Sequence, residues 1–259
     1  MRKITINLAA VAAFCIVVAS PALVSSSCAT PKTEQEDTTI IREDSGITAL
    51  KYSSPEVPAS IEFCGKTIDL SRFDRHERMD RELLAFTYMH STSLQMLKKA
   101  NRYFPIVEPI LKENGIPYDF KYLMVIESNM NPTARSSAGA AGLWQFMQGT
   151  GRDYGLEVNN NVDERYHIEK STRAACLYLK DAYAKYKDWV AVAASYNAGQ
   201  ARIASQLAKQ DVDDSLDLQL VEETARYVYR ILAAKQLFNA PTTFGFRLRA
   251  SDLYPPIPY

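Results

Sequence analysis

The sequence is poor in the residues that build metal centres and phosphate-binding sites. Its 259 residues include only three histidines and four cysteines, and none of these forms a cluster with metal-ligand spacing. It also lacks a glycine-rich phosphate-binding loop, an internal repeat, and the alternating strands and helices of a doubly wound α/β sheet. We therefore expect neither a metal ion nor a cofactor.

The sequence also lacks an excess of charge of either sign. Thirty basic residues balance thirty acidic ones, whereas a nucleic-acid-binding chain is expected to be basic overall. Apolar residues make up 47% of the chain, which is typical of a globular protein with a hydrophobic core. We therefore expect an ordinary soluble surface and no nucleic-acid partner.

The amino terminus has the pattern of a secretory signal. Arg2 and Lys3 precede an apolar run over residues 4–24, and three serines follow at positions 25–27. This order of basic, apolar and small residues predicts a signal peptide over residues 1–27. The alternative is a permanent transmembrane helix, against which Pro21 and the small-residue patch argue.

Cys28 follows this patch and is the candidate lipid anchor of a bacterial lipoprotein. The usual lipoprotein signal has an aliphatic residue three positions before the cysteine, where this chain has Ser25. We expect a periplasmic protein anchored to the outer membrane through Cys28. Cleavage between residues 22 and 27 would instead release a soluble periplasmic protein.

Two further cysteines remain after removal of the signal, Cys64 and Cys176. An exported protein can form a disulfide, and these two would be the available pair if Cys28 is acylated. Cys176 lies within a strongly helical segment, so we expect a buried free thiol there.

Two segments of different composition follow the signal peptide. Residues 28–58 are rich in Thr, Glu, Asp, Ser and Pro, which predicts a disordered tether. Residues 61–70 alternate weakly around Gly65 and predict a short β hairpin or an extended strap. We assign residues 59–110 to an amino-terminal helical extension packed on the domain that follows.

The remaining signals are helical, and the predicted fold class is all-α. Leu83, Phe86, Leu94 and Leu97 fall near one face of a long segment that starts at residue 80. A second helix is expected to begin at Pro105 and to end before Gly115. Further helices are expected over residues 118–128, 142–154, 168–186, 189–196, 200–209 and 221–238, with an extended, proline-rich tail at 239–259.

The main candidate for chemistry is Glu127. It lies on the same helical stripe as the apolar residues Phe120, Leu123 and Met124. Burial makes ionisation costly and raises a carboxyl pKa, so such a glutamate can stay protonated near neutral pH and act as a general acid. The alternative is a buried glutamate satisfied by an arginine or by backbone donors.

A run of small residues, 136–142, follows this helix after Asn131 and Pro132. Small residues let a bulky ligand approach the backbone closely. Residues 143–147 come next and supply a tryptophan, an amide and apolar side chains, which suit a sugar-binding pocket. Alternatively, the loop merely packs two helices together, and Trp144 and Phe146 are core residues.

Four motifs taken together resemble the soluble-lytic-transglycosylase (SLT) family. They are residues 125–128 (VIES), 139–147 (GAAGLWQFM), 195–199 (SYNAG) and 223–228 (ETARYV), in this order. The resemblance covers residues 60–238 and implies a goose-type lysozyme-like fold, with the SLT domain over residues 111–238. Each motif alone is weak; the four in order are specific.

The resemblance also implies roles for individual residues. Glu127 matches the single catalytic acid and base of the family. The matching substrate-binding positions are Ser136, Gln145, Tyr196, Asn197 and Tyr227. We interpret Glu223 as a helix-surface residue, and Asp163 and Glu164 as capping residues at the entry of a helix.

The implied activity is non-hydrolytic cleavage of the β-1,4 bond between N-acetylmuramic acid and N-acetylglucosamine in peptidoglycan. The product would carry a 1,6-anhydro-N-acetylmuramic acid end, and the enzyme would serve cell wall turnover as a monomer without a cofactor. Two alternatives remain, a hydrolysing muramidase on the same fold and a non-catalytic wall-binding lipoprotein. A carboxylate on an apolar stripe argues against the second.

Overall fold

The computed structural model describes residues 54–257, and these form an all-α fold with one short β hairpin, as predicted. The predicted signal peptide, Cys28 and most of the predicted tether lie outside the described residues. Within the described residues, no helix combines the length and apolar character needed to cross a membrane. The helices are α1 (Phe73–Tyr88), α2 (His90–Glu113), α3 (Phe120–Ser128), α4 (Gln148–Asp153), α5 (Ile168–Tyr186), α6 (Trp189–Ala198), α7 (Gln200–Lys209) and α8 (Glu222–Asn239).

The hairpin joins β1 (Ser60–Phe63) to antiparallel β2 (Lys66–Asp69), with Ile61 opposite Ile68. The two-residue turn is formed by Cys64 and Gly65, which both have positive φ values (53° and 82°). Such a turn matches the natural twist of a hairpin. Phe63 and Ile68 are buried, so the hairpin is a packed part of the domain.

The first helical stretch differs from the prediction in two ways. It begins at Phe73 and breaks at Met89 into α1 and α2, and Pro105 lies inside α2 together with Pro109 instead of starting a helix. Each proline removes one backbone hydrogen bond. The helix continues because one face of α2 is buried along its length, from Met96 to Leu111, and tertiary packing supplies most of the stability of a helix.

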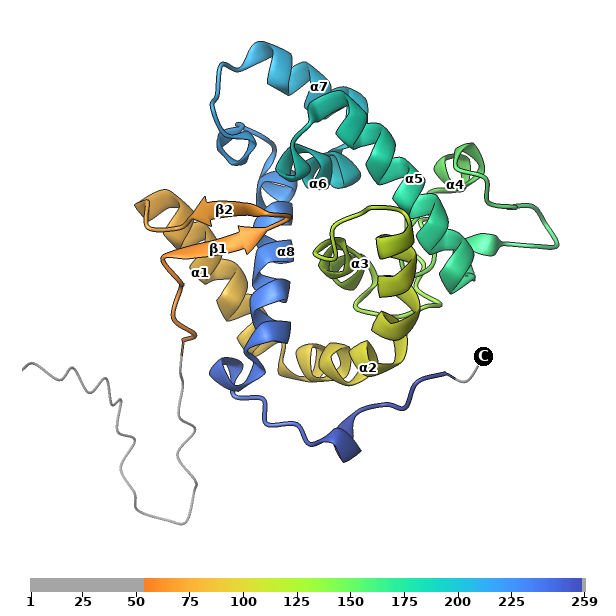
Figure 1. The fold of residues 1–259 in the computed structure, drawn as a ribbon, viewed down its shortest axis with the longest axis horizontal. Coiled ribbons are helices and arrows are strands. Elements are labelled where there is room, and N and C mark those ends of the chain that lie inside the picture. Colours follow the sequence, from red (N-terminus) through yellow and green to blue (C-terminus); the bar gives the residue numbers. More distant parts are fainter. Residues whose placement is uncertain (1–53, 258–259) are drawn as a thin grey trace, which may run out of the picture. The chain divides into compact units, whose positions relative to one another are not determined.

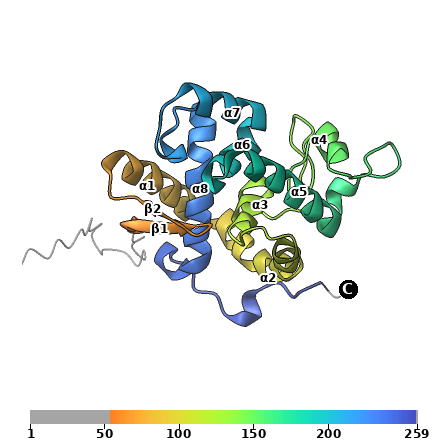
Figure 2. The same ribbon diagram turned by 45° about the horizontal axis from the view of Figure 1, so that its top comes forward.

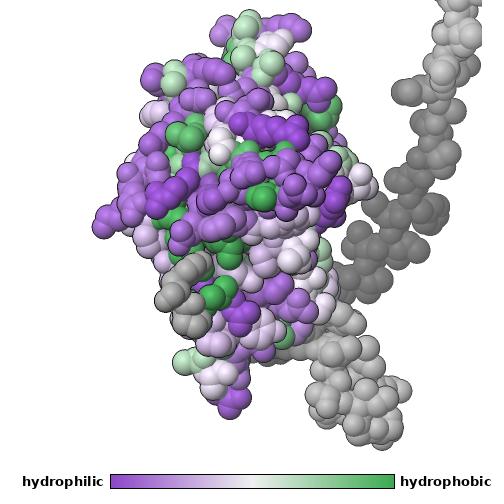
Figure 3. Space-filling view, turned by 90° about the vertical axis from the view of Figure 1, so that its right-hand side faces the viewer, coloured by the Kyte–Doolittle hydropathy of each residue, from purple (hydrophilic) through white to green (hydrophobic). Residues whose placement is uncertain are grey.

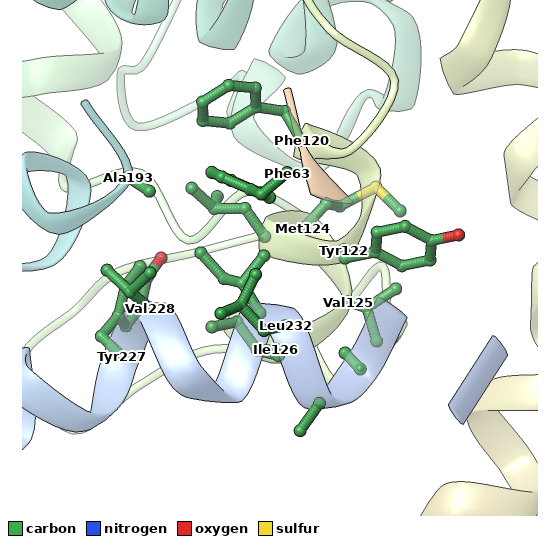
Figure 4. Packing of buried hydrophobic residues seen from close by; sticks show 14 of the residues in the cluster. Phe63, Phe120, Tyr122, Met124, Val125, Ile126, Ala193, Tyr227, Val228 and Leu232 are labelled. Carbon is green, nitrogen blue, oxygen red and sulfur yellow. The ribbon is translucent and has the colours of Figure 1, made fainter. Parts of the chain in front are cut away.

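Helix α3 is enclosed by α2, α5, α6 and α8 in both ribbon views (Figures 1 and 2). Phe120, Leu123 and Met124 are fully buried, as the apolar stripe predicted. Figure 4 shows the side chains of α3 meeting those of α8, with Ile126 beside Leu232. The short helix that carries Glu127 is therefore held rigidly by its surroundings.

The helix expected over residues 142–154 is shorter than predicted. Only Gln148–Asp153 is helical (α4), and residues 142–147 form a loop. Gly142 and Gln145 adopt left-handed conformations, with φ values of 78° and 48°, which an α-helix cannot accommodate. Backbone pairing of Ala141 with Arg135 and Phe146 closes the loop.

The carboxy-terminal helices agree closely with the prediction. Helix α5 spans residues 168–186, and Thr172, Ala175, Leu179 and Ala182 of its predicted stripe are buried. Helix α8 packs against α1, α3 and α6. It therefore contacts both the amino-terminal segment and the helix that carries Glu127.

The tail after α8 is not simply extended. Two short 3-10 turns interrupt it, at Pro241–Phe244 and Ala250–Asp252. Beyond them the chain runs along α2: the Tyr254 amide donates to Lys98 O (3.1 Å), and Asn101 donates to Tyr254 O (2.9 Å). These bonds to α2 are long-range, which is why local composition did not reveal them.

The face over α4 and α5 is mainly hydrophilic, with hydrophobic residues in small patches (Figure 3). Helix α5 turns its buried stripe inward and leaves residues such as Arg173 and Lys180 exposed. This surface is that of an ordinary soluble domain.

Candidate active site

Glu127 lies in the last turn of α3, on the side that faces α8. It is only partly exposed, whereas Ile126 and Ser128 beside it are buried. Helix α3 ends directly afterwards, because Asn129 and Met130 both adopt left-handed conformations with φ values of 49° and 56°. Two consecutive non-glycine residues in this region are uncommon, and such strain is concentrated at functional sites.

The carboxylate of Glu127 accepts a hydrogen bond from the hydroxyl of Tyr227 on α8. Burial raises the pKa of Glu127 to about 7, while the bond from Tyr227 and the positive charge of Arg230 oppose this and the charge of Glu223 adds to it. No arginine or lysine lies within ion-pair distance of Glu127 among residues 54–257. At neutral pH the group is therefore poised between its protonated and ionised forms.

Tyr196, from α6, lies close enough to this carboxylate to interact with its charge. Its hydroxyl donates to Trp144 O (2.8 Å), and its ring packs against Tyr178, with ring centroids 5.1 Å apart. Burial and the nearby charge of Glu127 hold the pKa of Tyr196 well above its usual value. Tyr196 therefore stays neutral and fastens the loop 142–147 to α6.

Asn197 follows Tyr196 but has a different partner. Its Oδ1 accepts a hydrogen bond from Thr224 Oγ1 (2.9 Å), which joins the end of α6 to the start of α8. Helix α8 therefore carries Tyr227 in a fixed position relative to Tyr196.

Ser136 and Gln145 lie at opposite ends of the small-residue loop. Ser136 Oγ accepts a hydrogen bond from the amide of Ala140 (3.0 Å). The Gln145 side-chain amide donates to Gly142 O (2.8 Å) and Ala134 O (3.2 Å). Both side chains are partly exposed; they hold the loop in shape, and the hydroxyl proton of Ser136 and the Oε1 of Gln145 have no partner there.

Sequence reasoning missed Arg165, which organises this loop from inside. Its side chain is 4% exposed and donates through Nη1 to Gly139 O (2.8 Å) and Phe146 O (3.0 Å). Asp163 pairs with it at 2.7 Å. Gly142 passes so close that an added Cβ would lie 1.9 Å from Arg165 O. The buried side of this loop could only be seen in three dimensions.

Of the two capping predictions, the one for Asp163 is confirmed, whereas Glu164 does not cap a helix. Asp163 caps the 3-10 turn Glu164–Tyr166 by accepting from the Arg165 amide, so the predicted capping role of Asp163 is confirmed. Glu164 accepts from the amide of Glu157 (2.8 Å) and pairs with Lys170. Glu223 is exposed on α8, as predicted.

Trp144 and Phe146 are core residues, so the interpretation of this segment as a flat aromatic surface for sugars is wrong. Trp144 is fully buried, and its Nε1 donates to Thr172 Oγ1 (2.9 Å). Phe146 is 3% exposed. Gln145, between the two rings, has a left-handed backbone conformation that the residue order did not reveal.

The cysteines play no part in this site. Cys176 is a buried free thiol in α5, as predicted, and Cys64 also has no disulfide partner within the part of the chain that the structure describes. Among residues 54–257, no group of three histidine, cysteine or acidic side chains is arranged to hold a metal ion.

A cleft of about 580 Å³ opens beside Glu127, between α1 and α8. Ile126 and Asn129, on either side of Glu127 in the sequence, line it, and so do the two charged residues that act on Glu127, Arg230 and Glu223. A half-buried acid thus lies next to an open cleft, with its sequence neighbours in the cleft wall.

Comparison with known proteins shows that part of this chain is similar to transglycosylases. Residues 105–217 match the family model of the transglycosylase SLT domain. Membrane-bound lytic murein transglycosylase D of Escherichia coli (strain K12) is 30% identical over 181 residues, which cover 68% of this chain and 39% of the relative. Peptidoglycan transglycosylase gp16 of Escherichia phage T7 is 30% identical over 138 residues, 51% of this chain and 10% of the relative.

A solved structure, an inactive mutant of lytic transglycosylase Slt from Pseudomonas aeruginosa, is 22% identical with a TM-score of 0.46. The match covers 55% of this chain and 24% of that one. The chain thus spans less than half the length of these relatives. All the matched proteins named here are transglycosylases by name.

Proposed function

We propose that this chain is a peptidoglycan lytic transglycosylase with Glu127 as its catalytic acid and base, because residues 105–217 match the family model of the transglycosylase SLT domain. The substrate is the β-1,4 bond between N-acetylmuramic acid and N-acetylglucosamine. The observation that carries the proposal is the half-buried Glu127, whose pKa is raised to about 7 beside an open cleft. A carboxyl with this pKa can both give and take a proton near neutral pH.

In the proposed mechanism, Glu127 first donates its proton to the glycosidic oxygen as the bond to C1 of muramic acid breaks. The N-acetyl group of the same sugar stabilises the charge that develops at C1. The C6 hydroxyl then attacks C1 and gives its proton to Glu127, which regenerates the acid and forms the 1,6-anhydro ring. The attacking hydroxyl belongs to the substrate, so no second molecule has to be positioned.

The other site residues have supporting roles in this proposal. Tyr227 holds the carboxylate of Glu127 in place through its hydroxyl. Tyr196 lines the site close to Glu127, and Asn197 fixes the start of α8. Ser136 and Gln145 keep a hydroxyl proton and an amide oxygen available for sugar hydroxyls, because their other bonds lie within the loop.

The proposal includes a location in the cell envelope. Residues 1–27 would direct export, Cys28 would carry a lipid anchor in the outer membrane, and residues 28–58 would tether the domain. Residues 59–110 would pack on an SLT domain at 111–238. The similar E. coli protein is named a membrane-bound enzyme, which supports an envelope location. Release as a soluble periplasmic monomer is the alternative to anchoring.

The first test is mass spectrometry of the fragments that residues 29–259 release from purified peptidoglycan. We expect anhydro-muropeptides, lighter by one water than hydrolysis products. Glu127→Gln should reduce their release by about 10²–10⁴-fold, the usual contribution of a general acid. Activity of the unmodified protein should fall as the pH rises through about 7, because Glu127 then loses the proton that it donates.

Three other outcomes would contradict the proposal. Reducing-end products would identify a hydrolysing muramidase. Binding to the wall without any product from either protein would favour a scaffolding role. Retention of most activity by Glu127→Gln would remove Glu127 from the mechanism. Circular dichroism of the variant shows whether a loss of activity comes from unfolding.

A further inference from the structure

The two helices that wall the cleft beside Glu127, α1 and α8, both lie outside the SLT match. The cleft is lined by α8 and the end of α1, including Phe86 and Met89, whereas the family model matches residues 105–217. At about 580 Å³, it lies within the usual range of ligand-binding clefts, about 300–1,000 Å³. It is therefore large enough for a substituent of the glycan in addition to the sugar at the cleavage site.

Most charged groups that line this cleft are already paired. Arg226 forms a two-pronged ion pair with the buried Glu82, at 2.6 and 3.1 Å. Glu222 pairs with Arg81. Arg230, in contrast, lines the cleft without an ion pair or hydrogen bond within the described residues. A guanidinium without such partners that lines a cleft is suited to bind a carboxylate through two parallel hydrogen bonds.

The rest of the lining favours short aliphatic groups. Phe86, Ile126 and Met89 form its apolar part, and Met89 is 43% exposed although it is a large apolar side chain. Glu223 is the one acidic group of the cleft without an ion pair among residues 54–257. It lies seven residues before Arg230 on α8, about 10 Å along the helix axis. A ligand with methyl side chains and a carboxylate fits the Arg230 end.

We propose that this cleft binds the stem peptide of the muramic acid residue at the cleavage site, with Arg230 recognising a free carboxylate of that peptide. The inference rests on the proposed function, because the stem peptide is the part of peptidoglycan that begins next to the bond that is cut. It consists of small residues such as alanine and ends in carboxylates. Arg230 is thus a specificity residue that makes the enzyme prefer peptide-bearing glycan.

The test compares two forms of one substrate, uncross-linked glycan strands with their stem peptides and the same strands after an amidase has removed them. Arg230→Gln should lower the ratio of kcat/KM for the first form to that for the second by about tenfold, the value of one charge-assisted hydrogen bond. The ratio is the readout because Arg230 also acts on the charge of Glu127, which affects both forms equally.

Two variants accompany this experiment. Arg230→Lys keeps the positive charge and should restore part of the ratio. Arg202→Gln removes an exposed arginine from α7 and should leave the ratio unchanged. An unchanged ratio in Arg230→Gln would overturn the proposal.

A binding measurement separates the failure of this proposal from that of the proposed function. Calorimetric titration of a free stem tetrapeptide into Glu127→Gln requires no catalysis. We expect binding that weakens about tenfold when the peptide carboxylates are amidated or when Arg230→Gln is added. Absence of catalysis together with this binding would overturn only the enzymatic proposal. Equal affinity for the free and the amidated peptide would overturn the role of Arg230.

Discussion

Glu127 and Glu82 both face α8, and the helix offers each carboxylate a different partner. Arg226 meets Glu82 with a two-pronged ion pair. The next residue, Tyr227, donates a single hydrogen bond from its neutral hydroxyl to Glu127. Consecutive residues of one helix point in directions about 100° apart. Arg226 of α8 can therefore bond to α1 while Tyr227 bonds to α3.

The consequences for the two glutamates are opposite. Glu82 is 2% exposed, and its ion pair fastens α1 to α8. Glu127 is desolvated without a paired cation, and its pKa rises to about 7. A buried carboxylate is therefore structural or reactive according to its partner. Burial alone does not distinguish the two.

The largest effect on stability is expected from Glu82→Gln. Loss of the charge leaves Arg226 without its partner, which we expect to lower the free energy of unfolding by about 2–3 kcal/mol. Urea denaturation at pH 7 measures the change. Glu222→Gln is the matched control, because its ion pair with Arg81 is exposed to solvent and should contribute little. Similar midpoints for the two variants would show that Glu82 is not a structural anchor.

A smaller effect of opposite sign is expected from Glu127→Gln. The folded-state pKa of about 7 lies above the usual value of 4.5, so the contribution of Glu127 to stability is greatest below about pH 4.5 and is lost as the pH rises through about 7. The variant escapes this loss. We expect it to be more stable than the unmodified protein by about 1–2 kcal/mol at pH 8, because the partly exposed carboxylate keeps some solvation.

At pH 4 the two proteins should be equally stable, since Glu127 is then protonated in both the folded and the unfolded states. Thermal unfolding at both pH values checks this difference. A variant that is less stable at pH 8 would mean that Glu127 contributes to stability as Glu82 does.

The smallest effect is expected from Tyr227→Phe. The hydroxyl stabilises the ionised form of Glu127, so its removal should raise the pKa of Glu127 further. The fall in activity at high pH should then move to higher pH, with a change in the maximal rate of less than about tenfold. The pH dependence of anhydro-muropeptide release measures both quantities.

Tyr229→Phe is the matched control on the same helix. The Tyr229 hydroxyl is buried and has no hydrogen-bond partner among residues 54–257, so its removal should leave the pH profile where it is. A shift of equal size in both variants would point to a general effect on α8 instead of the bond to Glu127.

Much of the molecule was predictable from local sequence. The hairpin at Cys64–Gly65, helix α5 and the apolar stripe of α3 follow from turn chemistry and periodicity, which are properties of neighbouring residues. The placement of Glu127 on that stripe is of the same kind. Pro105 misled the prediction because a local rule was overridden by the buried face of α2.

The sequence by itself determined the all-α class and the presence of a carboxyl on the apolar face of α3, because both depend on spacings of a few residues. Only the tertiary structure decided that Tyr227, one hundred residues away, bonds to Glu127, that Arg226 pairs with Glu82, and that Trp144 turns into the core. These contacts join distant segments, and their geometry depends on how the helices pack around α3 and α8. Whether a carboxylate meets a cation or a hydroxyl is set by that packing.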